Sequence, residues 1–247
     1  MIPKVIHYCW FGRNPLPNSA LKCIESWRIY CPGYEIIEHN EDNYDIEIYE
    51  YAKEAYEAKK WAFVSDIARL DILYQYGGIY LDTDVELLKS LDDLLDCDGF
   101  MGFEDNKQVA SGLGMAAVPH STIIELLLSG YDKSNFIKEN GEYDLTPCPI
   151  RITKDLLKIG LIPDGSYQEI CNFKFFPRDV LAPKESTSGR LKYFTKNTRA
   201  IHHYDASWQT PLFHKIKKIN YILGGRLGSK VIKVMIKLRL IGSELSL

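Results

Sequence analysis

Two aspartates separated by one residue, Asp82 and Asp84, follow a short apolar run at residues 78–81. The run is rich in residues that favour β-strands, so we expect the two carboxylates where a strand ends and the chain turns. There both side chains can reach one cation, and hard oxygen ligands suit Mg²⁺ or Mn²⁺. A cation held in this way keeps positions open for phosphate oxygens and can neutralise charge on a departing diphosphate.

A second pair of charges strengthens this interpretation, because two aspartates at this spacing are common by chance and are usually solvated side chains at a turn. Residues 61–76 predict a helix that is apolar nearly all round, which indicates burial. The helix nevertheless carries Asp66 and Arg69, which lie side by side. Buried charges are costly unless they are paired. Such a pair can accept hydrogen bonds from sugar hydroxyls and donate to phosphate, or it can be a structural salt bridge.

Three motifs, taken in order along the chain, resemble one family of enzymes. They are the opening residues 2–12, the segment 65–84 with both charged pairs, and the late segment 202–208. The chain is similar there to the D-x-D glycosyltransferases of the capsular-polysaccharide and yeast initiating mannosyltransferase type, which are glycosyltransferase family 32-like. The catalytic domains of the large clostridial glucosylating toxins look similar over the middle segment. Residues 105–195 match the pattern only loosely.

The resemblance implies a GT-A fold, a nucleotide-sugar donor that is UDP-linked, and retention of the anomeric configuration. It also implies roles for individual residues. Trp10 would stack on the donor base, and Asp66 and Arg69 would hold the sugar. Tyr80 would line the donor pocket. Asp82 would be shared between the donor and the metal.

The same resemblance gives Asp84 direct contact with the metal and adds residues near the end of the chain. Ser207 and Trp208 would lie against the diphosphate, and His202 would be a late metal or phosphate ligand. Structural alternatives stay open at this stage. Trp208 could anchor the chain end, and Trp10 could be a core aromatic residue at the end of a strand.

The order of the predicted elements indicates an α/β fold. Strand-like segments at 2–11 and 34–39 flank a helix-like segment at 19–30, which is typical of a mainly parallel central sheet flanked by helices. Further helices are expected at 49–60, 61–76, 121–128 and 152–159, and further strands at 78–81, 99–104, 113–118, 173–176 and 200–202. The 247 residues fit one GT-A-like domain at 1–211, with a donor-binding part at 1–130 and an acceptor side at 131–211.

The remaining residues, 212–247, differ from the rest of the chain in charge. Eight basic side chains against Glu244 alone give them a charge of +7, so residues 1–211 carry −10 of the total of −3. Basic residues between apolar ones at helical spacing predict a basic amphipathic helical tail. Such a tail is typical of a membrane-surface helix, and packing on the acidic domain is the alternative. Nucleic acid is not expected as a partner.

Cysteine spacing and hydropathy bear on location. The six cysteines form no Cys-x-x-Cys pair, which predicts reduced thiols and neither a zinc site nor a disulfide framework. No apolar stretch approaches the ~20 residues that span a bilayer. We therefore expect a cytoplasmic protein, with peripheral contact to the inner face of the membrane through residues 212–247.

These observations lead to one function hypothesis with two alternatives. The chain is expected to be a metal-dependent hexosyltransferase that moves a sugar to a hydroxyl of an oligosaccharide or lipid-linked acceptor, in surface polysaccharide or capsule biosynthesis. An aspartate-nucleophile phosphatase could also begin with Asp82-Thr83-Asp84, but no later Lys and Gly-Asp motif of that class is evident. A non-catalytic nucleotide-sugar-binding protein is the other alternative.

Overall fold

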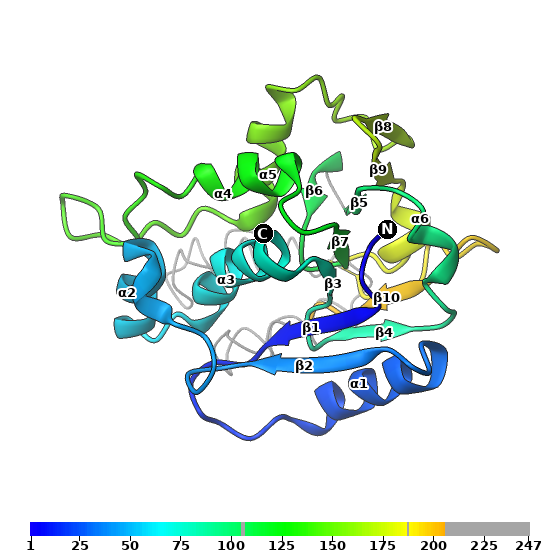
Figure 1. Ribbon diagram of the computed structural model, residues 1–247, viewed down its shortest axis with the longest axis horizontal. Coiled ribbons are helices and arrows are strands. Elements are labelled where there is room, and N and C mark those ends of the chain that lie inside the picture. The colour runs from blue at the N-terminus through cyan, green and yellow to red at the C-terminus, as the bar shows by residue number, and fades with distance from the viewer. Residues whose placement is uncertain (105–106, 187, 206–247) are drawn as a thin grey trace, which may run out of the picture.

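A mixed eight-stranded sheet with helices on both faces forms the centre of the molecule in a computed structural model that describes residues 1–104, 107–186 and 188–205 (Figure 1). The strands are β1 (Val5–Cys9), β2 (Glu35–His39), β3 (Gly78–Tyr80), β4 (Val85–Leu87), β5 (Gly99–Phe103), β6 (Val109–Ala110), β7 (Met115–Ala117), β8 (Gln168–Ile170), β9 (Phe173–Phe176) and β10 (Ala200–His202). The helices are α1 (Asn18–Tyr30), α2 (Glu50–Glu57), α3 (Trp61–Tyr76), α4 (Thr122–Ser129), α5 (Cys148–Leu157) and α6 (Arg178–Leu181), with the 3₁₀ turns η1 (Ile46–Ile48) and η2 (Asp92–Leu94).

The order of strands in the sheet is β2-β1-β3-β7-β5-β9-β8, with β6 beside β5. Strand β1 pairs in parallel with both β2 and β3, and β5 pairs in parallel with β9. Strand β7 runs antiparallel to both of its neighbours, because the segment that joins it to β5 is too short for a parallel crossover. The predicted α/β fold with helices flanking a central sheet is confirmed.

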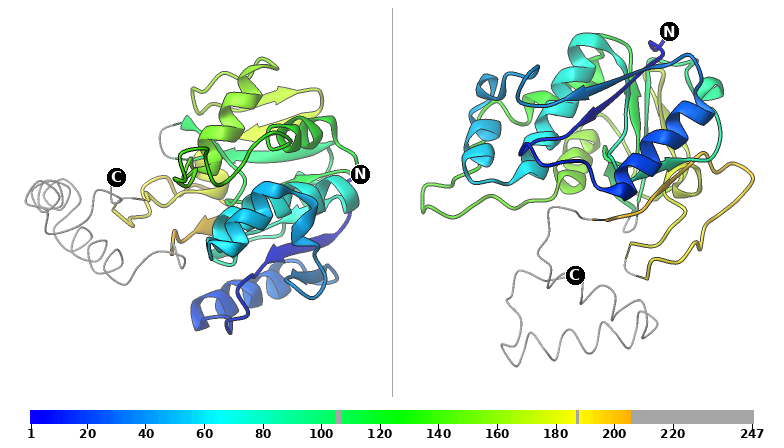
Figure 2. Two further views of the ribbon diagram at one scale, coloured as in Figure 1. Left: turned by 90° about the vertical axis from the view of Figure 1, so that its left-hand side faces the viewer. Right: turned by 90° about the horizontal axis from the view of Figure 1, so that it is seen from below.

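Alternation along β1 assigns its side chains to opposite faces of the sheet. Ile6 and Tyr8 join the core that contains Trp27 of α1, whereas Cys9 joins the core built around α3. The turned views in Figure 2 show α1 on one side of β1 and β2, and α2 and α3 on the other. Two cores therefore hold β1 and β3 between them.

Several predicted elements have the predicted bounds, among them α3, β9 and β10. Helix α5 was expected to start at residue 152 but begins at Cys148, because Pro147 caps it and Pro149 occupies its first turn. A proline is tolerated there, since the first backbone N–H groups of a helix have no partner within it. Strands β4, β6 and β8, each of two or three residues, were not predicted.

Two further expectations can be compared with the structure. All six cysteines are free thiols, as predicted. Within the described ranges no helix is long and apolar enough to cross a membrane. The predicted tail at 212–247 and its membrane contact lie outside the described residues.

A buried pair of histidines supports the start of β3. The Nε2 of His7 lies 3.1 Å from the carbonyl oxygen of Gly77, which can only accept, so His7 donates there. Its Nδ1 then accepts from the Nε2–H of His39 at 2.9 Å. Gly78 has φ +97° and lies close to the backbone of β1. A Cβ added to it would lie 2.8 Å from the Val5 carbonyl oxygen. Burial lowers the pKa of both histidines to about 4.

These lowered pKa values predict that acid destabilises the protein. Between the ordinary histidine pKa of about 6.5 and the folded value of about 4, the unfolded chain binds protons that the folded chain does not. Stability therefore falls as the pH drops through this window, by up to roughly 3 kcal/mol for each histidine. Urea unfolding at about pH 7 and about pH 5 measures the slope.

The double variant His7→Asn, His39→Gln should be less stable at neutral pH but should show a shallower dependence of unfolding free energy on pH. An unchanged slope would show that other groups cause the acid sensitivity.

Candidate functional site

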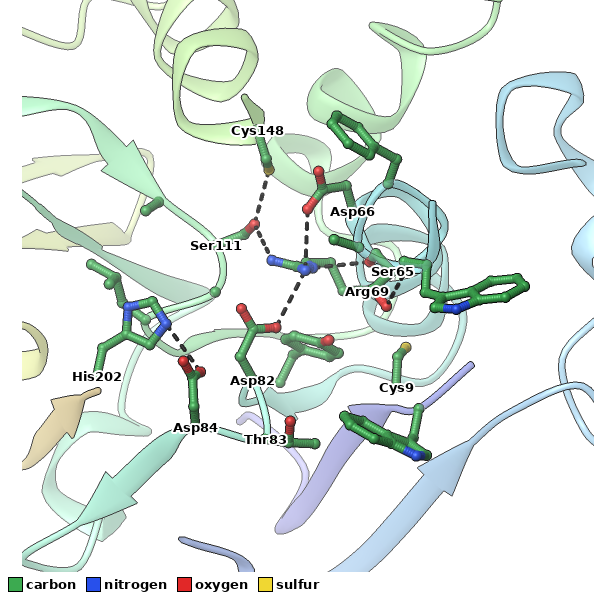
Figure 3. A pocket seen from close by; sticks show the side chains of 18 of the residues that line it. Cys9, Ser65, Asp66, Arg69, Asp82, Thr83, Asp84, Ser111, Cys148 and His202 are labelled. Atoms are coloured by element: carbon green, nitrogen blue, oxygen red, sulfur yellow. Dashed lines mark hydrogen bonds and ion pairs between the residues drawn. The ribbon is translucent and has the colours of Figure 1, made fainter. Parts of the chain in front are cut away.

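A cleft of about 650 Å³ lies at the carboxyl ends of β1 and β3. Its lining includes an aromatic group, to which Trp10, Phe11 and Trp61 belong, and a group of charged side chains. The charged residues are Asp66, Arg69, Asp82, Asp84, Glu104 and His202. Figure 3 shows most of this charged group from close by. Residues from all three predicted motif regions thus line one cavity. Of the last region, only residues 202–205 are among those that the structure describes.

Arg69 lies at the centre of the charged group (Figure 3). Its Nη2 is 3.1 Å from Asp66 Oδ1 and 3.2 Å from Asp82 Oδ1, so one guanidinium nitrogen bridges helix α3 and the end of β3. Its Nη1 donates to Ser111 Oγ at 3.1 Å, and its Nε donates to the Ser65 carbonyl at 2.9 Å. Every nitrogen of the guanidinium therefore has a partner, and its side chain is only 6% exposed.

Burial changes the acidity of the two carboxyl groups that share Arg69. It raises the pKa of Asp66 to about 6, although Arg69 acts in the opposite direction. Burial also raises the pKa of Asp82, again against the effect of Arg69. Both groups depend on the guanidinium to keep their charge in a buried site, since an unpaired buried carboxylate would take up a proton.

The small sheet of β4 and β10 brings His202 to the second aspartate. In its antiparallel register His202 is opposite Val85, the residue after Asp84. His202 Nε2 lies 3.1 Å from Asp84 Oδ1, and the other carboxylate oxygen accepts from the backbone N–H of Asp205 at 2.8 Å. Helix α1 fixes β4 in turn, through the Trp27 indole, which donates to the Val85 carbonyl at 2.7 Å.

The contact between Asp84 and His202 shifts the pKa of both groups. Burial would raise the pKa of Asp84, but His202 and the Asp205 N–H outweigh it and hold that pKa well below its usual range. Burial would likewise lower the pKa of His202, and Asp84 raises it above its ordinary value instead.

Asp82, Asp84 and His202 form a set that could hold a metal ion. One ligand atom from each lies within 4.8 Å of the others. Two carboxylates and one imidazole suit a first-row divalent ion. His202 Nδ1 is buried and has no hydrogen-bond partner among the described residues, so its ring is not committed to a structural network on that side. These residues fit the predicted metal site.

Two other predicted site residues, Trp10 and Tyr80, also line the cleft. Tyr80 lines the cleft but is 1% exposed, and its ring lies 4.9 Å from Arg69 Cζ, where it supports the guanidinium. Trp10 lines the cleft with its indole N–H bonded to the Asn14 carbonyl at 2.6 Å. Ser207 and Trp208 lie outside the described residues.

Sequence reasoning missed the wall opposite Arg69. Ser111 and Gly112 come from the turn between β6 and β7, and Cys148 from the first turn of α5; all three line the cleft. The available signal was the glycine-rich stretch at residues 110–114, which indicates close approach of backbone to another group. Cys148 gave no signal, because a lone cysteine is usually a packing residue.

Comparison with known proteins agrees with this geometry. Residues 17–101 match the family described as "Glycosyltransferase sugar-binding region containing DXD motif". That segment contains Asp66, Arg69 and the Asp82–Asp84 pair. Residues 17–101 are therefore similar to the sugar-binding region of the DXD glycosyltransferases. The resemblance predicted from the sequence is confirmed for this region.

Two curated relatives come from Schizosaccharomyces pombe (strain 972 / ATCC 24843). Inositol phosphoceramide mannosyltransferase 3 is 32% identical over 102 residues, which are 38% of this chain and 27% of the relative. Inositol phosphoceramide mannosyltransferase 2 is 28% identical over 138 residues, which are 54% of this chain and 39% of the relative. The chain thus spans well under half the length of these relatives.

Solved structures of glycosyltransferases also resemble the chain in part. The PaToxG glycosyltransferase has a TM-score of 0.45 at 17% identity, covering 64% of this chain and 68% of that one. A glycosyltransferase involved in glycosylation of the major capsid of PBCV-1 has a TM-score of 0.45 at 14% identity, with coverages of 83% and 95%. The galactosyltransferase LgtC has a TM-score of 0.42 at 12% identity, with coverages of 82% and 88%.

Replacing Arg69 with Met should destabilise the fold strongly. The change leaves two partly buried carboxylates without their shared, buried cation, and breaking a buried pair typically costs about 3–5 kcal/mol. Urea unfolding at neutral pH measures the loss. Arg28→Met is the matched control, because it breaks an ion pair with Glu25 whose side chains are 58% and 60% exposed and which contributes at most about 1 kcal/mol. Equal losses in the two variants would contradict the bridging role of Arg69.

Proposed function

We propose that the protein is a metal-dependent glycosyltransferase that moves a sugar from a nucleoside-diphosphate donor, UDP-linked, to a hydroxyl group. One observation carries the proposal: a buried guanidinium joins Asp66 of α3 to Asp82, and Asp82 in turn shares a candidate metal site with Asp84 and His202. Transfer of a sugar from a diphosphate needs carboxylates that bind the sugar next to a metal that binds the diphosphate.

Asp84, His202 and Asp82 would hold the metal, with Asp84 as the direct carboxylate ligand. The imidazole favours Mn²⁺ over Mg²⁺, because Mg²⁺ prefers an all-oxygen shell. A metal bound there would neutralise charge on the leaving diphosphate. His202 must then give up the proton that it shares with Asp84, since ligands bind metal in their deprotonated form.

Asp66 and Asp82 would accept hydrogen bonds from the donor sugar. Arg69 already has a partner on every nitrogen, so it would act by keeping both carboxylates charged and fixed rather than by binding phosphate itself. Trp10 would offer its indole face to the base, since its N–H is already bonded to a carbonyl. A cleft of about 650 Å³ is within the usual range for a ligand of this size.

We propose that transfer retains the anomeric configuration without a covalent enzyme intermediate. Asp66 and Asp82 are paired with Arg69, and Asp84 is paired with His202, which makes each a poor nucleophile. The acceptor hydroxyl would attack the face that the diphosphate leaves. The leaving phosphate oxygen would take the acceptor proton.

The acceptor is proposed to be an oligosaccharide or a lipid-linked glycan, bound on the side of the domain formed by residues 131–211. The names of the fungal relatives include a lipid acceptor, inositol phosphoceramide. This is consistent with a lipid-linked hydroxyl. A role in surface polysaccharide assembly at the cytoplasmic face of a membrane would fit such an acceptor.

Asp84→Asn should reduce sugar transfer by about 10²–10³-fold or more, because it removes the charge that holds the metal. The assay incubates the protein with Mn²⁺ and a panel of nucleotide sugars, and measures nucleotide release and product formation. Asp42→Asn is the control, since this exposed carboxylate contacts Arg13 and does not line the cleft.

Native activity in Asp84→Asn would contradict the proposed metal role. Release of phosphate from a simple ester, without nucleotide release from any donor, would instead establish the phosphatase alternative.

A donor that binds with micromolar affinity should raise the melting temperature when present at millimolar concentration. Binding to the folded state alone contributes roughly 4 kcal/mol under these conditions, equivalent to a shift on the order of 10 °C for a chain of this length. The shift should require Mn²⁺ and should be lost in Asp84→Asn. Binding without turnover for every acceptor tested would favour the non-catalytic alternative.

A further inference from the structure

We propose that Ser111 and Gly112 are positioning residues for recognition of the donor sugar, acting through Arg69 and Asp82. The inference rests on the proposed function and deepens it. The site then has one part that binds the sugar and another part that binds the nucleotide. Ser111 and Gly112 belong to the first part.

Ser111 fixes the orientation of the guanidinium. Its side chain is fully buried, and its Oγ accepts from Arg69 Nη1 at 3.1 Å while lying 3.2 Å from Cys148 Sγ. In Figure 3 Ser111 approaches the guanidinium from the side of β6 and β7, whereas Asp66 approaches it from α3. Without the hydroxyl, Nη1 would lose this partner in a buried place, and Arg69 would be free to turn toward a new one.

Gly112 provides the space in which Asp82 lies. A Cβ on Gly112 would lie within 2.1 Å of Asp82 Oδ2 and 3.2 Å of Arg69 Nη1. No side chain fits there unless the carboxylate moves. The backbone at Gly112 does not have a positive φ, so alanine would strain no dihedral angle. Glycine is therefore required at this position because a Cβ would collide with the Asp82 carboxylate, and not because of its backbone angles.

The two residues belong to one turn, which the sheet holds in place. The backbone N–H of Asp82 lies 3.4 Å from the Gly112 carbonyl, and β7, which follows the turn, pairs directly with β3. The turn and Asp82 therefore share a support in the sheet. Ser111 contacts the Arg69 guanidinium and Gly112 adjoins the Asp82 carboxylate, so the turn limits where these two groups can lie.

This arrangement predicts that the turn affects binding of the sugar and not of the nucleotide. The carboxylates held by Arg69 are the groups proposed to accept from sugar hydroxyls. The base would lie on Trp10 and the diphosphate on the metal, for which Asp84 is the direct carboxylate ligand and Asp82 is shared with the sugar. A small rotation of the guanidinium leaves Trp10, Asp84 and His202 in place, so a nucleoside diphosphate without its sugar should be much less sensitive to it.

The test compares two affinities in Ser111→Ala with Mn²⁺ present. The ligands are the best donor from the thermal-shift panel, for example UDP-glucose, and the nucleoside diphosphate it contains, here UDP. We expect the donor to bind about tenfold more weakly, equivalent to about 1.4 kcal/mol, while binding of the nucleoside diphosphate changes less than about twofold. Calorimetric titration measures both constants, and the donor KM should rise in parallel.

Thr198→Ala controls for a general loss of stability. Thr198 is also buried, and its hydroxyl donates to the Asp179 carbonyl at 2.7 Å, but it does not line the cleft. This variant should melt at a lower temperature and keep both affinities. If Ser111→Ala weakened both ligands equally, or neither, the inference would be wrong. If the wild-type protein bound neither ligand, the proposed function itself would fail.

Gly112→Ala gives a second, independent measurement. Because the added methyl group displaces the Asp82 carboxylate, we expect loss of donor affinity greater than in Ser111→Ala. Gly102→Ala is the matched control, since its Cβ would meet only apolar side-chain atoms, the nearest at 3.1 Å. Donor affinity that is unchanged in Gly112→Ala would overturn the positioning role of this turn.

Discussion

The site depends on one interaction, the bridge that Arg69 makes between Asp66 and Asp82. Two partly buried carboxylates that lie this close repel each other and favour protonation. A single guanidinium offsets both effects, and it does so with donors in a planar fork that fixes where each carboxylate points. The bridge joins a helix to the end of a strand, so the geometry of the site and the packing of α3 on the sheet depend on the same side chain.

The rest of the fold serves to hold the groups around this bridge. Strands β1 and β3 lie between two cores, and the buried histidines His7 and His39 fix the turn from which β3 starts. The small sheet of β4 and β10 carries His202 to Asp84 across more than a hundred residues of sequence. The result is a cleft in which charged groups that would be unstable alone are supported from several elements at once.

Much of the fold could be predicted because its local signals are strong. The helix at 61–76 is apolar, ends at a glycine and was predicted with its observed bounds. The prediction was weaker where neighbours in space decide the structure. Strands as short as β4 and β6 have no periodicity of their own. Each is held by its partner strand and by one side chain, Trp27 or Thr153, that binds its backbone. The early start of α5 depends on a proline that fits a first turn.

The sequence by itself predicted several residues that meet in the cleft: the aspartates at a strand end and the Asp–Arg pair on an apolar helix from residue type and spacing, and the late histidine from the family resemblance. Residue type and spacing along one element are local properties, and they can be read directly. Only the tertiary structure decided how these groups are shared. It showed that Arg69 pairs with two aspartates rather than one. It also placed Ser111 against Arg69 and Gly112 against Asp82. Those contacts join residues that are distant in sequence, and no local pattern specifies which of them will meet.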